Sequence, residues 1–199
     1  MTFIELLLPS WADLATWAGV LIAAALFIGV GRLLSLGRAA PEAALVAGWG
    51  GACLALTLWG VATAASLRWP ATAIAAAGLV GLALPRFRLE AAVWRGMLRM
   101  AVVALPLLAI MASARPSLPD TFLNLLPNAA YLYDHATFPA DDRWPAHSFL
   151  PAAPYNMQLA AFVAALFTPG FPPAAMIALN LVLQLAFSLF LARLVERGD

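Results

Sequence analysis

The sequence has no lysine, one cysteine and few charges of either sign, and each scarcity narrows the class of protein. All eleven basic residues are arginine, and ten acids leave a net charge of +1. With so few cations, the chain has no basic patch to neutralise phosphates, so nucleic acid is not an expected partner. Cys53 has no second cysteine with which to form a disulfide within the chain, so cysteine usage indicates no redox compartment.

Apolar residues dominate instead. They make up 64% of the chain, against roughly 45–50% in soluble domains, and the mean hydropathy is +0.89. Six apolar stretches approach the length of about 20 residues that a membrane helix needs. They cover 12–31, 43–67, 70–85, 94–114, 155–168 and 174–192. We therefore expect an all-α integral membrane protein, a polytopic helical bundle of about six transmembrane helices.

Polar and proline-rich residues divide this bundle into three parts. N-terminal transmembrane helices occupy 1–114, an extracytoplasmic loop with short interfacial helices occupies 115–154, and a C-terminal transmembrane hairpin occupies 155–199. The sequence TPGFPP at 168–173 interrupts the hairpin, because Pro and Gly end helices. Runs of Ala and Gly within the spans predict close packing of helices in lipid.

The arginines predict the orientation of the chain in the membrane. Six of them fall in the loops after the first and third spans, whereas three fall on the opposite side. Because arginine-rich loops stay cytoplasmic, we expect loop 115–154 on the outer side of a bacterial cytoplasmic (inner) membrane. Arg193 and Arg197 fit this rule only if 155–168 does not cross completely, and the sequence leaves that point open.

Loop 115–154 gathers the side chains that transfer protons or bind metals. It contains four of the ten acids and both histidines of the chain. Asp120 follows a proline and precedes an apolar run, as a helix N-cap residue does. Pro127 suits the first turn of a second short helix that lies along the membrane surface. The stretch 139–154 is rich in proline and predicts an irregular loop.

These polar residues have several interpretations. As structural groups they form a helix cap, a solvated helix end or a local ion pair. As functional groups, carboxylates act as a general base or bind a hard divalent cation such as Mg²⁺ or Mn²⁺. A metal site would use His135, His147 and Asp141 or Asp142. No zinc-protease, redox, nucleotide-binding or hydrolase motif occurs, so no motif selects among these alternatives.

Four phrases within residues 97–197 together resemble the start of the GT-C superfamily of membrane glycosyltransferases, which includes protein mannosyltransferases and lipid A glycosyltransferases. They are ARPSLPDTF, LPNAAYLYDHATFP, APYNMQLAAFVAALFTPGFPP and ALNLVLQLAFSLFLARLVER. In that superfamily a span is followed by a large extracytoplasmic loop with an early acid, then a juxtamembrane helix and a further span. The resemblance lies in this order of elements.

The resemblance implies a donor in which a sugar is linked to polyprenyl phosphate, in contact with membrane lipid. It implies that Asp120 is the general base that takes a proton from an acceptor hydroxyl while the phosphate leaves. Asp141 and Asp142 are candidates for a second acidic element. Candidate substrate-binding residues are Asp134, His135, Arg143, His147 and Tyr155. Because members have more spans, the chain is expected to be an N-terminal part that is inactive without a C-terminal half or partner subunit.

A second interpretation is a non-catalytic membrane scaffold or transporter-like subunit that packs with a partner. No ionisable residue lies at the centre of a predicted span, so the sequence shows no ion path, which favours a scaffold over a transporter. The two interpretations differ in their response to Asp120→Asn. An enzyme loses activity, whereas a scaffold tolerates this change and responds to bulky residues in its Ala- and Gly-rich faces.

Overall fold

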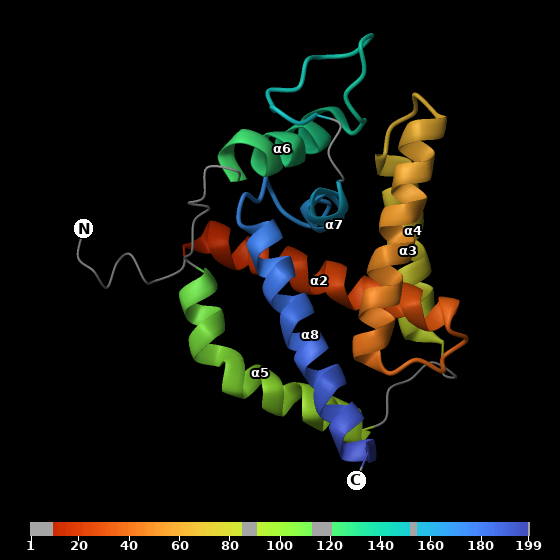
Figure 1. Cartoon of the computed structure of the whole chain (residues 1–199), viewed down its shortest axis with the longest axis vertical. Coiled ribbons are helices and arrows are strands. Elements are labelled where there is room, and N and C mark those ends of the chain that lie inside the picture. The colour runs from red at the N-terminus through yellow and green to blue at the C-terminus, as the bar shows by residue number, and fades with distance from the viewer. Residues whose placement is uncertain (1–9, 85–90, 113–120, 152–154, 199) are drawn as a thin grey trace, which may run out of the picture.

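All regular structure that the computed structural model describes is helical (Figure 1). The described residues are 10–84, 91–112, 121–151 and 155–198. The elements are α2 (Trp11–Leu34), α3 (Pro41–Ala62), α4 (Arg68–Ala83), α5 (Ala91–Ala112), the π-helical turn η2 (Thr121–Leu125), α6 (Leu126–His135), α7 (Asn156–Ala165) and α8 (Ala175–Gly198). The expected all-α class is confirmed for this part of the chain.

Three of these helices are long and apolar enough to cross a membrane, namely α2, α3 and the Ala175–Val195 part of α8. Their length and composition support the expected association of the chain with a membrane. Two other predicted spans contain helices shorter than the roughly 20 residues that a membrane crossing needs. Helix α4 has 16 residues and α7 has 10. Helix α5 covers most of the predicted span 94–114. The total of six crossings therefore stays a prediction.

Helix α2 organises the bundle, because it contacts α3, α4, α5, α7 and α8. Its glycines allow the backbones of neighbouring helices to approach closely. A Cβ atom on Gly29 would meet the carbonyl oxygen of Gly78 in α4, and a Cβ on Gly31 would meet that of Ala44 in α3. Close packing through small residues, as the sequence predicts, is therefore found where α2 crosses α3 and α4 (Figure 1).

Helix α7 lies in the centre of the protein. Every residue from Gln158 to Ala165 is buried, and the helix contacts α2, α3, α6 and α8. Ten residues at 1.5 Å each give about 15 Å, half the thickness of a hydrocarbon core of about 30 Å. The hairpin expected over 155–199 thus consists of one half-length core helix and one full-length helix, separated by the expected break at 168–173.

The short elements η2 and α6 form a layer at one end of the bundle. Figure 1 shows α6 lying across this end, with residues 139–151 on its far side from α8. Pro127 lies in the first turn of α6, as the sequence predicts. Asp120, the expected cap of the preceding helix, lies outside the described residues.

Candidate functional site

The C-terminal end of α6 carries the polar side chains of the site. Asp134 and His135 are the last two residues of this helix, and both are exposed. Ala136 ends the helix in the left-handed conformation with φ 51°, and its N–H donates to the carbonyl of Leu132 at 2.8 Å. The carbonyl of Ala136 accepts a hydrogen bond of 2.7 Å from the N–H of Leu67. The turn between α3 and α4 therefore fixes this end of α6.

The segment that follows α6 folds back over η2 and α6. The buried Asn128 Nδ2 donates to the carbonyl of Leu150 at 3.1 Å, and the N–H of Phe149 donates to the carbonyl of Leu123 at 3.2 Å. Residues 139–151 contain no helix or strand, in agreement with the irregular loop that the prolines predict. The two hydrogen bonds hold this irregular segment against the polar end of the bundle.

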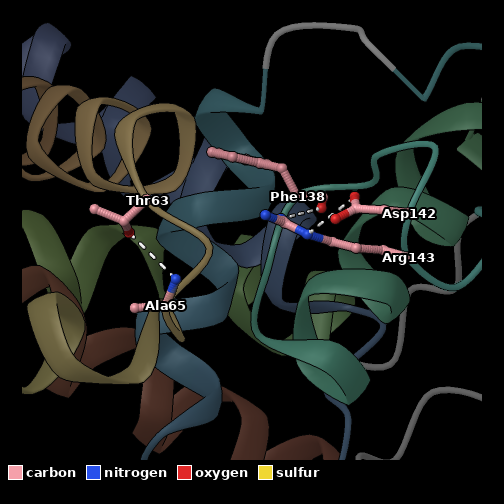
Figure 2. A network of polar contacts seen from close by, with 5 residues as sticks. All are labelled: Thr63, Ala65, Phe138, Asp142 and Arg143. Carbon is pink, nitrogen blue, oxygen red and sulfur yellow. Dashed lines mark hydrogen bonds and ion pairs between the residues drawn. The ribbon is translucent and has the colours of Figure 1, made fainter.

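Arg143 is fixed by groups that lie close to it in the sequence. Its Nη1 donates to the carbonyl of Phe138 at 2.9 Å, and its Nε lies 3.9 Å from Oδ1 of Asp142 (Figure 2). The Asp142 side chain is 83% exposed, so this ion pair contributes little to stability. Figure 2 also shows the α3–α4 turn, where the N–H of Ala65 donates to Oγ1 of Thr63 at 3.3 Å.

A cavity of about 630 Å³ lies between the end of α6, the α3–α4 turn and the segment that contains Arg143. The polar and aromatic side chains in its wall are Tyr131, Asp134, His135, Asp142, Arg143 and Trp144. Two smaller cavities of about 350 and 280 Å³ share Asp134 with it. The structure therefore brings together Asp134, His135, Asp142 and Arg143, four of the residues that the sequence singles out.

Asp134 is the carboxylate in the best position for chemistry. It lines all three of these cavities and makes no hydrogen bond or ion pair with another described residue. The side chain of Arg68, the first residue of α4, lines the cavity of about 350 Å³. Its guanidinium likewise makes no hydrogen bond or ion pair within the described part of the chain. A hydroxyl can donate to the carboxylate and a phosphate can pair with the guanidinium, so the cavity suits a ligand with both groups.

Aromatic rings complete the wall of the cavity of about 630 Å³. The ring of His135 lies between Tyr131, at a centroid distance of 4.6 Å, and Trp144, at 6.1 Å and nearly parallel with an interplanar angle of 14°. Aromatic faces provide rigid apolar contact area beside hydrogen-bonding groups. A wall that combines the two suits a ligand with both an apolar face and hydroxyl groups, as a sugar has.

The remaining sequence-predicted residues occupy different positions. Asp141 is exposed and lines none of the three cavities that share Asp134. His147 lines the smallest of them, together with His135 and Asp134. Asp120, the predicted general base, lies outside the described residues, so its role stays a prediction.

Tyr155 holds parts of the segment that follows α6 in place through its contacts with Pro151 and Phe138. It is buried, its hydroxyl donates to the carbonyl of Pro151 at 2.6 Å, and its ring packs against Phe138 at a centroid distance of 4.9 Å. Burial raises the pKa of this phenol to about 12, with a smaller contribution from Tyr131. Tyr155 lines none of the three cavities around Asp134, so its contacts fix the loop and do not reach a ligand there.

No metal centre is formed by the residues that the structure describes. Among them, no three His, Cys, Asp or Glu side chains come together in a way that could hold a metal ion. The alternative in which His135, His147 and Asp141 or Asp142 bind Mg²⁺ or Mn²⁺ therefore gains no geometric support in this part of the chain.

Three residues of the site were not among the sequence candidates, namely Arg68, Tyr131 and Trp144. The distribution of arginines predicts Arg68 on the same side of the membrane as loop 115–154, which is the one sequence signal for its position. The hydrogen bond from Leu67 to Ala136 brings the two regions together. Without long-range contacts, the sequence gives no reason to pair Arg68 with Asp134.

Comparison of the chain with protein-family models, with curated proteins and with solved structures finds no match in any of the three. The interpretation of the site therefore depends on its geometry and chemistry.

Proposed function

We propose that this chain is the N-terminal part of a polytopic membrane glycosyltransferase whose donor is a sugar linked to polyprenyl phosphate. The observation that carries the proposal is the Asp134 carboxylate, which has no hydrogen-bond or ion-pair partner among the described residues. It lines a cavity with guanidinium and aromatic groups at one end of a bundle of apolar helices. A lipid-linked sugar requires such a site, because its chain stays in the bilayer while its sugar reaches water. The resemblance of residues 97–197 to GT-C enzymes points to the same donor.

In this proposal Asp134 is the general base. It takes the proton from an acceptor hydroxyl, whose oxygen then bonds to the anomeric carbon of the sugar. The bond between that carbon and the phosphate oxygen breaks, and polyprenyl phosphate leaves with the bonding electrons. Arg68 and Arg143 pair with the phosphate, and Trp144 contacts the sugar. Asp120 remains a second candidate for the base.

The arrangement of the ends of the bundle supports the proposed orientation. The C-terminal end of α8, which carries Arg193, lies at the opposite end of the bundle from α6 (Figure 1). By the positive-inside rule, the end with Arg193 and the turn at 35–40 faces the cytoplasm. The cavity then opens on the outer side of a bacterial inner membrane, where lipid-linked sugars meet extracytoplasmic acceptors.

The proposal is tested by Asp134→Asn, which keeps the shape of the side chain and removes its basicity. The substitution is made at the native locus, so that any further segment or partner subunit is present in both the variant and the wild type. The release of polyprenyl phosphate from a panel of labelled polyprenyl-phosphate sugars is then measured in isolated membranes. Polyprenyl phosphate is the product with every acceptor, so the assay does not require the acceptor to be known. Loss of a general base is expected to lower this rate roughly 100-fold or more.

Asp141→Asn is the matched control, because Asp141 is an exposed acid seven residues away that lines none of the three cavities. Its rate is expected to equal that of the wild type. Equal rates for all three proteins, or no donor consumed above membranes that lack the protein, would contradict the assignment. Asp120→Asn in the same assay distinguishes the two candidate bases.

A second candidate function, a non-catalytic subunit that packs with a partner, is favoured by α5. Leu98, Val102, Val103 and Leu107 of this helix are exposed, and Val103 is 82% exposed. A partner helix or lipid can cover these side chains. Co-purification of one stoichiometric partner, lost in Val103→Asp but kept in Asp134→Asn, would favour the subunit over the enzyme.

A further inference from the structure

The cavity of about 630 Å³ has more acidic than basic groups in its wall. Asp134 and Asp142 line it, and Arg143 supplies the one guanidinium among its lining residues. When the imidazole of His135 is uncharged, two carboxylates and one guanidinium leave the wall with an excess of one negative charge. The volume lies within the range of about 300–1,000 Å³ that is usual for sites of small ligands. The charge of this cavity therefore favours a ligand that carries a positive group.

The guanidinium of Arg143 is largely engaged within the protein, whereas the carboxylates are not. Its Nη1 donates to the carbonyl of Phe138 at 2.9 Å, and its Nε lies 3.9 Å from Oδ1 of Asp142. That long contact leaves the Asp142 carboxylate, which is 83% exposed, able to accept further hydrogen bonds. Asp134 makes no hydrogen bond or ion pair with another described residue. The groups that remain open to a ligand are thus mainly hydrogen-bond acceptors.

Tyr131 adds an independent observation to the same wall. Its side chain lines the cavity, and the residue is only 5% exposed. Its buried hydroxyl oxygen has no hydrogen-bond partner in the part of the chain that the structure describes. Because a buried polar group without a partner is costly, a polar ligand group is expected close to it. A phenol oxygen can accept from an N–H, so Tyr131 also favours a ligand with hydrogen-bond donors.

The aromatic rings of the wall distinguish an organic cation from a metal ion. Tyr131 and Trp144 lie on either side of His135, and both line the cavity. The faces of aromatic rings attract ammonium groups, and tryptophan does so most strongly. Among the described residues, no three His, Cys, Asp or Glu side chains come together to hold a metal ion. The wall is therefore better suited to an ammonium group attached to a carbon chain.

From these observations we infer that the cavity of about 630 Å³ binds the primary ammonium group of a ligand. The three N–H groups of the ammonium donate to the carboxylates of Asp134 and Asp142, and the adjoining carbon atoms pack against Trp144. Two sources present this group at a membrane surface, namely the phosphoethanolamine headgroup of a phospholipid and a soluble amine such as ethanolamine. The inference concerns binding and does not depend on the proposed glycosyl transfer.

The test uses the protein purified after expression from its native locus, with any further segment or partner subunit, in nanodiscs of phosphatidylcholine. It is titrated in a calorimeter with glycerophosphoethanolamine, with glycerophosphocholine and with ethanolamine, and the heats from empty nanodiscs are subtracted. Glycerophosphocholine is the matched ligand, because its ammonium group carries three methyl groups and no N–H. It is expected to bind roughly fivefold or more weakly than glycerophosphoethanolamine, since it leaves the carboxylates without donors.

The same titrations distinguish the two sources of the ammonium group. Tighter binding of glycerophosphoethanolamine than of ethanolamine would assign the cavity to the phospholipid headgroup. Equal affinity for these two ligands would mean that the ammonium group alone is recognised, as in a site for a soluble amine. Equal affinity for glycerophosphoethanolamine and glycerophosphocholine, or no binding of any of the three, would overturn the inference.

Substitutions of the acids test whether binding takes place in this cavity. Asp142→Asn is expected to weaken binding of glycerophosphoethanolamine roughly threefold, because an exposed charge contributes modestly. The double variant Asp134→Asn/Asp142→Asn is expected to weaken it roughly tenfold or more. All three positions, including that of the control below, are exposed, and circular dichroism checks that the helical content of each variant matches the wild type.

Asp141→Asn is the control for these variants. It removes the same charge from the residue beside Asp142, but Asp141 lines none of the three cavities around Asp134. Its affinity for glycerophosphoethanolamine is expected to equal that of the wild type. Equal weakening in Asp141→Asn and Asp142→Asn would mean that the negative charge of the whole loop attracts the ligand, and the cavity would then not be its binding site.

Discussion

Nε of Arg193, near the end of α8, lies 3.0 Å from Oε1 of Glu42, the second residue of α3. The Glu42 side chain is only 1% exposed and that of Arg193 is 24% exposed. Neither carboxylate oxygen of Glu42 has a hydrogen-bond partner among the residues that the structure describes, so the contact is an ion pair without hydrogen-bond alignment. It joins the end of α8 to the start of α3. Arg193 therefore lies at the same end of the bundle as the 35–40 turn, and its side of the membrane stays a prediction.

Removing the charge of Arg193 is expected to lower the free energy of unfolding more than removing the charge of Glu42. Arg193→Gln leaves a buried carboxylate without its counter-charge and is expected to destabilise the protein by about 3 kcal/mol, the lower end of the range for buried pairs. Glu42→Gln leaves an arginine that reaches solvent, so its cost is expected to be smaller. Unfolding of the detergent-solubilised protein, followed by circular dichroism as denaturant is added, measures both.

The double variant Glu42→Gln/Arg193→Gln separates the energy of the ion pair from the effect of each substitution alone. It removes both charges and leaves no unpaired one, so it is expected to be more stable than Arg193→Gln alone. Strictly additive losses in the double variant would mean that the two side chains do not interact, and the contact would then have no energetic role.

The crossing of α2 and α4 gives a second prediction. A methyl group on Gly29 would meet the backbone of Gly78, which cannot move aside as a flexible side chain can. Gly29→Ala is therefore expected to destabilise the protein by roughly 1–3 kcal/mol or to force the helices apart. Gly50→Ala in α3 is the control, because a Cβ there meets no atom of the described residues within 4 Å. Thermal unfolding in the same detergent is expected to show Gly50→Ala equal to or above the wild type, by up to about 1 kcal/mol. Equal losses of stability in Gly29→Ala and Gly50→Ala would contradict the idea that the close approach of the two backbones at Gly29 causes the destabilisation.

Alkaline pH gives a third prediction, through Tyr155. Its pKa is raised from about 10 to about 12 in the folded protein, so the folded state holds the phenolic proton more tightly than the unfolded state. This contribution to stability is fully present below pH 10 and is lost as the pH rises toward 12. Because the chain has no lysine, no ammonium side chain titrates in the same window.

Tyr155→Phe is the matched substitution for this effect. It removes the hydrogen bond to Pro151 and is expected to cost about 1 kcal/mol at neutral pH. Because phenylalanine has no phenolic proton to lose, the decrease in stability between pH 10 and 12 is expected to be smaller than in the wild type. Melting temperatures measured across this range report the difference. Parallel curves for the two proteins would assign the alkaline loss to other groups.

Local sequence patterns predict the helices of this protein well and their surroundings less well. The apolar run at 12–31 becomes α2 and the break at 168–173 becomes a turn, because hydrophobicity and proline act locally. The run at 155–168 looked like a span, but α7 is surrounded by protein instead of lipid. An apolar run has the same composition in either environment, and only its length of ten residues distinguishes them.

The candidate site shows the same limit. Asp134, His135, Asp142 and Arg143 were predictable because they share one polar loop, and a loop brings its own residues together. Arg68 reaches the site through the hydrogen bond between Leu67 and Ala136, a contact between distant parts of the chain that no local pattern encodes. Composition likewise does not show that Asp141 lines none of the three cavities around Asp134 while its neighbour Asp142 lines one.

The aromatic wall of the cavity of about 630 Å³ gives the last prediction. Trp144 stacks on His135 and lines the cavity, yet it is 71% exposed, so its removal should disturb ligand contact more than folding. Trp144→Ala is expected to weaken binding of a polyprenyl-phosphate sugar by about 1 kcal/mol, or roughly fivefold.

Trp69→Ala is the control, because Trp69 is 74% exposed and lines none of the cavities around Asp134. Titration of the protein in nanodiscs with the donor, and with polyprenyl phosphate that lacks the sugar, measures both variants. If Trp144 contacts the sugar, the substitution weakens binding of the donor and leaves binding of the sugar-free lipid unchanged. Equal weakening of both ligands would mean that the indole contacts the lipid phosphate or shapes the loop.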